Sequence, residues 1–116
     1  MKLIKKADRP IPTNSIKVAK MDGAKTKSLK KFYRKIADRL DFPDYFGTNL
    51  DALADALMDL SWLKENDVRL YIKNPDAFLS KEKKSTKNTV LEILAEAAAN
   101  QIEEDRTFIV LSLIHI

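Results

Sequence analysis

The chain has 116 residues, of which 45% are hydrophobic and 33% are charged, as is typical of soluble globular proteins. This length predicts one domain with one core. The absence of cysteine excludes disulfides, thiolate metal sites and cysteine nucleophiles. No segment approaches the run of about 18 apolar residues that a membrane helix needs, and the first residues lack the apolar stretch of a signal peptide. We therefore expect a cytoplasmic protein that does not bind membranes.

The charges are distributed unevenly along the chain. The formal net charge is +4, but residues 1–39 hold 13 Lys/Arg against 3 Asp/Glu, whereas residues 40–67 hold 7 acids against a single lysine. Residues 68–116 carry 7 charges of each sign. A basic first third thus precedes an acidic middle, and we expect functional faces of opposite sign.

The first elements are a basic arm and a strand. Residues 1–14 contain Pro10 and Pro12, which block regular strand pairing, so we expect a loosely docked arm there and one domain over residues 15–116. The partial alternation of residues 15–21 predicts a strand, which Asp22-Gly23 ends in a turn.

A helix is predicted over residues 26–40, because apolar residues recur at intervals of three or four. Its apolar face consists of Leu29, Phe32, Tyr33, Ile36 and Leu40. Its other face is basic and consists of Lys27, Lys30, Lys31, Arg34, Lys35 and Arg39. Pro43 ends this helix.

The acidic stretch 41–60 organises the rest of the chain. It begins as a turn at Tyr45-Phe46-Gly47 and continues as a helix, with Thr48 and Asp51 in the spacing of a capping box. One face of this helix is apolar and consists of Leu50, Leu53, Leu57 and Leu60.

A second face of the same helix carries Asp51, Asp55 and Asp59. Like charges at this spacing repel by about 0.2–0.5 kcal/mol per pair. No lysine or arginine lies within the helix to relieve them. Asp51 has an ordinary role near the positive end of the helix dipole, but Asp59 near the other end has none. A solvated face explains Asp51 well and Asp59 less well, and the alternative is a stripe that binds Lys or Arg of a positively charged partner.

The second half of the chain holds two strands and a long helix. The predicted elements are a strand at 68–72, a short helical turn at 76–80, a polar loop at 81–88, a helix at 89–102 and a strand at 107–114. The inward residues of the long helix are expected to be Val90, Leu91, Leu94, Ala98 and Ile102. The last strand is the most apolar run of the chain, which favours a place at the sheet centre or cover on both faces.

The order strand, helix, helix, strand, helix, strand predicts an α/β fold. Helical crossovers between strands favour a small three-stranded parallel sheet packed with three to four helices.

Catalytic chemistry has little support in this sequence. The single histidine, His115, is next to the last residue, and Gly23 and Gly47 are the only glycines, so a Gly-rich phosphate loop is excluded. The aspartate stripe has oxygen ligands that suit Mg²⁺ or Ca²⁺, but no second ligand-bearing motif accompanies it. We expect no enzyme, no catalytic residue, no metal and no cofactor.

Two features allow more than one interpretation. Tyr45 and Phe46 suit a core as well as an interface, where tyrosine is enriched. The basic helix face that holds Lys30 to Lys35 suits electrostatic binding of nucleic acid. Without stacking aromatic residues on that face, a solvated surface is favoured.

The run from Phe42 to Asp55 resembles the barstar family of intracellular ribonuclease inhibitors. The family pattern is Pro-acid-Tyr-Tyr/Phe-Gly-x-Asn-Leu-Asp-Ala-Leu-x-Asp, and nearly every position matches. The predicted order of elements extends the likeness loosely over residues 15–114.

The resemblance implies a barstar-like fold and a bacterial immunity protein, the antitoxin of a toxin–antitoxin pair. Such a protein plugs the basic active-site cleft of a cognate ribonuclease with its acidic helix and the preceding turn. Asp55 matches the family's most buried contact. The positions carried over are Tyr45, Phe46, Gly47, Asn49, Asp51, Asp55 and Glu96, and the next family acid matches Asn100.

Two further residues complete the candidate partner surface. Asp59 belongs to the acidic stripe, and Ala54 stands where the family pattern has tryptophan. Met58-Asp59-Leu60 also replaces the family's Thr-Gly-Trp, so we expect a ribonuclease other than barnase as the target. Two alternatives stay open, namely a nucleic-acid-binding module that uses residues 1–39 and a barstar-fold adaptor without a nuclease partner.

Overall fold

A computed structural model describes residues 16–103 and 105–113. The predicted arm at residues 1–14 and His115 lie outside these residues. The elements in chain order are β1 (Ile16–Asp22), the 3-10 helix η1 (Gly23–Lys25), α2 (Leu29–Arg39), α3 (Leu50–Asp59), β2 (Asp67–Lys73), α4 (Lys84–Glu103) and β3 (Thr107–Leu113). None of the helices described is long and apolar enough to cross a membrane.

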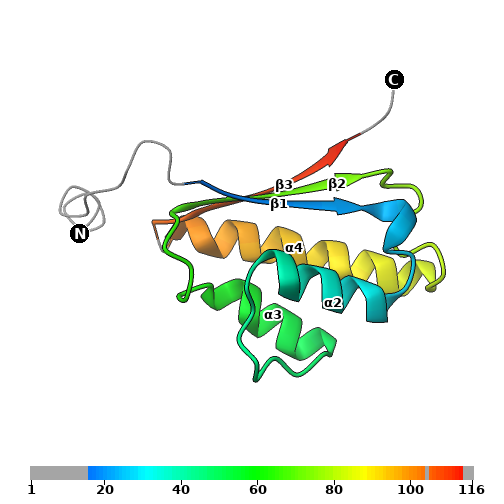
Figure 1. Ribbon diagram of the computed structural model, residues 1–116, viewed down its shortest axis with the longest axis horizontal. Coiled ribbons are helices and arrows are strands. Elements are labelled where there is room, and N and C mark those ends of the chain that lie inside the picture. Colours follow the sequence, from blue (N-terminus) through cyan, green and yellow to red (C-terminus); the bar gives the residue numbers. More distant parts are fainter. Residues whose placement is uncertain (1–15, 104, 114–116) are drawn as a thin grey trace.

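The three strands form one parallel sheet in the order β1-β2-β3. Ala19, Leu70 and Val110 are aligned across it. All three α-helices lie on one side of the sheet, and α3 lies farthest from it (Figure 1). The predicted α/β class, with a three-stranded parallel sheet, is confirmed.

The predicted place of the last strand was wrong. β3 is an edge strand, and the side chains of Ile109 and Leu111 are 37% and 38% exposed on the face opposite the helices. The central strand is β2, whose buried and partly exposed residues alternate. An apolar run indicates a strand, but it does not say whether helices cover the second face.

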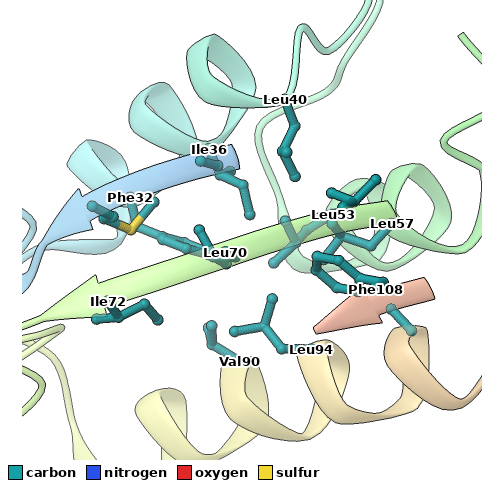
Figure 2. Packing of buried hydrophobic residues seen from close by; sticks show 14 of the residues in the cluster. Phe32, Ile36, Leu40, Leu53, Leu57, Leu70, Ile72, Val90, Leu94 and Phe108 are labelled. Atoms are coloured by element: carbon teal, nitrogen blue, oxygen red, sulfur yellow. The ribbon is translucent and has the colours of Figure 1, made fainter. Parts of the chain in front are cut away.

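The core lies between the sheet and the three helices. Figure 2 shows side chains of α2, α3 and α4 that converge on β2. The fully buried members include Phe32, Ile36, Leu53, Leu57, Leu70, Ile72 and Leu94. Burial of each such side chain stabilises the fold by about 1.5–3 kcal/mol.

The structure also corrects the long helix. α4 begins at Lys84, within the predicted loop 81–88, because that polar segment contains neither glycine nor proline to stop a helix. Its buried face consists of Val90, Leu94, Ala97 and Gln101. The predicted inward residues Leu91 and Ile102 are instead 41% and 68% exposed.

The turn after β1 brings three segments into close contact. The Thr26 hydroxyl donates to the Asp22 carbonyl, and the Leu79 amide donates to the Thr26 carbonyl over 3.0 Å. Gly23 is buried at this junction. A Cβ there would lie 2.2 Å from the Asn74 carbonyl oxygen and 2.9 Å from the Phe78 amide nitrogen, which are backbone atoms.

We predict that Gly23→Ala destabilises the protein by about 1–3 kcal/mol, because overpacking here has to displace backbone. Urea unfolding followed by circular dichroism measures the change. The matched control is Gly47→Ala, because a Cβ at Gly47 would meet Ala52 at an ordinary 3.9 Å. Equal stability of the two variants would contradict the close packing at Gly23.

Candidate functional site

The turn between α2 and α3 is built from backbone hydrogen bonds. Asp41 leaves α2 in a left-handed conformation (φ 54°), and the Phe42 amide donates to the Ala37 carbonyl over 2.8 Å. The Phe46 amide then donates to the Pro43 carbonyl over 3.0 Å, which closes the turn. These bonds fix the path of residues 41–46.

An aromatic cluster packs between this turn and the core. The Phe42 ring meets the Phe46 and Trp62 rings edge to face, with centroids 4.8 Å and 5.6 Å apart. The Trp62 indole N–H donates to the Leu40 carbonyl over 2.9 Å. Phe46 packs against the core, whereas Tyr45 is 81% exposed. The core interpretation therefore applies to Phe46, whereas the Tyr45 side chain is exposed and accessible to a partner.

Asn49 is the residue that caps α3. Its side-chain oxygen accepts from the Ala52 amide over 2.8 Å, and its backbone is extended. The capping box predicted from Thr48 and Asp51 is therefore wrong, because Asn49 occupies the N-cap position. The apolar face of α3 lies inward, and Asp51, Asp55 and Asp59 are exposed.

The far end of α3 is held by polar side chains from α4 and the segment after it. α3 ends with Leu60 in a left-handed conformation (φ 50°). The buried Gln101 amide donates to the Leu57 and Met58 carbonyls over 2.8 Å and 2.9 Å. The Arg106 guanidinium donates to the Leu60 carbonyl and, over 2.9 Å, to the Leu63 carbonyl. The last carbonyls of the helix are thus satisfied inside the protein.

A surface hollow of about 250 Å³ lies between the turn and α3. The residues that line it are Pro43, Tyr45, Phe46, Gly47, Ala52, Asp55, Ala56, Asp59 and Trp62. The hollow combines aromatic walls with two carboxylates on a rigid helix. Such a combination suits a guanidinium or ammonium group, which carboxylates bind through charge-assisted hydrogen bonds.

The carboxylates of this site are free to bind a partner. In residues 16–103 and 105–113, no ion pair involves Asp51, Asp55 or Asp59. The last turn of α3 contains no basic residue. Within the same residues, no group of three or more His, Cys, Asp or Glu side chains is arranged to hold a metal ion. The site is therefore an acidic surface with cation-binding chemistry.

Sequence comparison relates the chain to known proteins. The profile of a family described as barstar (barnase inhibitor) matches residues 16–112. The chain belongs to the barstar family. It is also 34% identical over 92 residues to a Bacillus subtilis protein named "Putative ribonuclease inhibitor YrdF", an alignment that covers 77% of this chain and 93% of that protein. The description of the family and the name of this relative are both those of ribonuclease inhibitors.

The nine candidate partner residues do not all lie at one place, and five of them share the hollow. Tyr45, Phe46, Gly47, Asp55 and Asp59 line the hollow. Asn49 caps the helix, and Asp51 lies in its first turn. Ala54 is half-buried and Glu96 is exposed on α4, and neither of them lines the hollow.

Sequence reasoning missed the residues that support this barstar-family site. Trp62 lines the hollow, and Gln101 and Arg106 hold the end of α3. A signal was present for Gln101 alone, since it lies on the apolar stripe of α4 at the spacing set by Leu94 and Ala97.

We predict that Gln101→Leu destabilises the protein by about 1–3 kcal/mol, because the Leu57 and Met58 carbonyls lose a buried donor. The free energy of unfolding from urea titration tests this. The control is Glu92→Gln at an exposed position of the same helix. If Gln101→Leu is as stable as this control, then the end of α3 does not depend on Gln101.

Proposed function

We propose that this protein inhibits a cognate ribonuclease by docking α3 and the turn 43–47 in the basic active-site cleft of that enzyme. The observation that carries this proposal is the hollow in which Asp55 and Asp59 lie beside Tyr45, since neither carboxylate forms an ion pair with any residue in 16–103 or 105–113. The barstar family and the name of the Bacillus subtilis relative support the same function.

The chemistry of a ribonuclease cleft explains why carboxylates would bind there. Such a cleft holds cationic side chains that bind the phosphates of RNA. In the proposed complex, Asp55 takes the place of a phosphate and accepts hydrogen bonds from arginine or lysine. Asp51 and Asp59 flank it on the same helix face, and Glu96 adds negative charge from α4.

The rigid support of α3 favours affinity as well as geometry. The N-cap at Asn49 and the donors at Gln101 and Arg106 hold both ends of the helix in place. The carboxylates are therefore positioned before the partner arrives, and little conformational freedom is lost on binding. Because residues 40–67 carry a net charge of −6, the same surface also steers a basic nuclease toward it.

The proposed partner is a ribonuclease toxin other than barnase, and the inhibitor acts without catalysis inside the bacterial cell that produces the toxin. Ala54 and Met58 stand where the family pattern has tryptophan and threonine, so the rim around Asp55 has a different shape. A rim of different shape fits a different enzyme surface.

We predict that Asp55→Ala weakens inhibition at least about tenfold, which corresponds to about 1.4 kcal/mol of binding free energy. The loss follows because a cation of the nuclease would be buried without its partner. The measurement is the inhibition constant for RNA cleavage by the ribonuclease encoded beside this protein, together with protection of cells that express that enzyme.

The matched control is Asp76→Ala, which removes the same charge from an exposed position in the turn after β2. It is expected to inhibit like the unmodified protein. If Asp55→Ala protects cells as well as Asp76→Ala does, then α3 does not plug the active site.

Gly47 provides a second test of the docking surface. It is exposed, its φ is not positive, and the space around it accommodates a Cβ. Nothing in the described chain thus requires glycine at this position. A glycine suits a place where a partner approaches the backbone closely.

We predict that Gly47→Ala leaves the melting temperature unchanged within about 1 °C but weakens inhibition severalfold, because its methyl group would separate the turn from the nuclease. Differential scanning calorimetry and the same inhibition assay measure both quantities. Unchanged inhibition would place Gly47 outside the interface.

A further inference from the structure

The outer face of α2 and the neighbouring strand ends carry a basic surface that has no role in the proposed inhibition. Two adjoining hollows lie there, of about 410 Å³ over the outer face of α2 and about 470 Å³ where α2 meets the ends of β1 and β2. We call them together the basic groove, whose unpaired cations are Lys20, Lys25, Lys31, Arg34, Lys35 and Lys73. Lys25 and Lys35 line both hollows.

The cations of the basic groove outnumber the acids beside them. Asp38, one of the two acids in the groove, pairs with Arg39 over 2.6 Å. The other acid, Asp22, accepts from the Asn74 amide and the Ala24 backbone, each over 2.9 Å. Within residues 16–103 and 105–113, no ion pair involves any of the six cations. The groove therefore has a strongly positive field.

The charges converge from separate segments of the chain. The hydrogen bonds from Asn74 and Ala24 hold the pKa of Asp22 below its ordinary value, and the positive charges of Lys73 and Lys25 lower it further. Lys73 ends β2 and Lys25 ends η1, so the fold brings them to the same place. A solvated helix face alone would not gather lysines from two strands and a turn.

The groove also contains an aromatic ring. Tyr71 lines it from β2, is half-buried, and is aligned with Lys20 across the sheet. Stacking aromatics were missing from the helix face that the sequence pointed to, because this ring lies on a neighbouring element. A positive groove with an aromatic side chain is the common plan of single-strand nucleic acid sites.

We propose that the basic groove binds the phosphate backbone of single-stranded RNA, with one base stacked on Tyr71. On α2, Lys31 is three and four residues before Arg34 and Lys35, a spacing that places their side chains on neighbouring parts of one helix face. Lys20 and Lys73 continue this positive track onto the sheet. Among the described residues, no asparagine or glutamine lines the groove to form hydrogen bonds with the edges of bases. We therefore expect the binding to be independent of RNA sequence.

This activity is separate from the proposed inhibition. The basic groove and the hollow beside α3 have no lining residue in common. RNA is also the substrate of a ribonuclease. A protein bound to RNA through the basic groove would therefore be close to that enzyme, and α3 would remain available to inhibit it.

The test uses the full chain and a fluorescein-labelled 12-nucleotide oligouridylate, with fluorescence anisotropy measured from 50 to 200 mM KCl. We expect binding to weaken with salt, with a log–log slope of about −0.7 for each phosphate contacted. The double variant Lys25→Gln/Lys35→Gln should bind at least about tenfold more weakly at 50 mM KCl, with a slope smaller by about 1.4. The matched control is Lys83→Gln/Lys84→Gln, which removes the same charge from exposed positions outside the groove.

Two further measurements make the outcome decisive. Tyr71→Leu should lower affinity about fivefold or more without changing the salt slope, because stacking releases no counterions. Equal effects of the groove and control double variants, or competition by polyglutamate as strong as by unlabelled RNA, would overturn the proposal. Asp55→Ala should bind RNA normally, and Lys25→Gln/Lys35→Gln should inhibit the ribonuclease normally, so each proposal can fail without the other.

Discussion

The position of the acidic helix depends on how its last carbonyls are satisfied. α3 is a 10-residue helix, too short to be stable by itself, and its three aspartates repel one another. Gln101 and Arg106 reach its end from α4 and the following segment, and Asn49 caps its start. These hydrogen bonds, together with buried Leu53 and Leu57, hold a like-charged surface in a single geometry. The acidic hollow could not keep its shape without them.

The protein separates its charges spatially as well as along the sequence. The acidic hollow uses the turn after α2 and the outer side of α3, whereas the basic groove uses the outer side of α2 and the strand ends. The Lys17–Asp41 ion pair, 2.7 Å long, links β1 to the start of the turn. Because most other charges are not paired across this boundary, each surface has an electrostatic potential of one sign. This potential attracts a partner of opposite charge.

Periodicity predicted the parallel sheet, both short helices and their inward faces, because the spacing of apolar residues directly reflects which side is buried. It failed where burial depends on distant segments. The outward residues of β3 are apolar although none of the described helices covers them, and α4 extends to Lys84 through a polar segment in which the Lys87 ammonium donates to the distant Pro75 carbonyl over 3.1 Å. The aspartates of the site could be predicted from sequence, but the hollow could not. Its shape depends on Trp62 and on contacts between α3 and α4, which no local pattern encodes.

The place of Trp62 has a consequence for experiments in solution. It is the single tryptophan of the chain. Its indole N–H is bound to the Leu40 carbonyl, its ring meets Phe42, and it lines the hollow beside Asp55. The protein therefore contains a natural optical probe at the edge of its acidic surface, with no second indole elsewhere to obscure the signal. Emission from this one residue reports on the polarity and solvent access of the hollow in the unlabelled, unmodified protein.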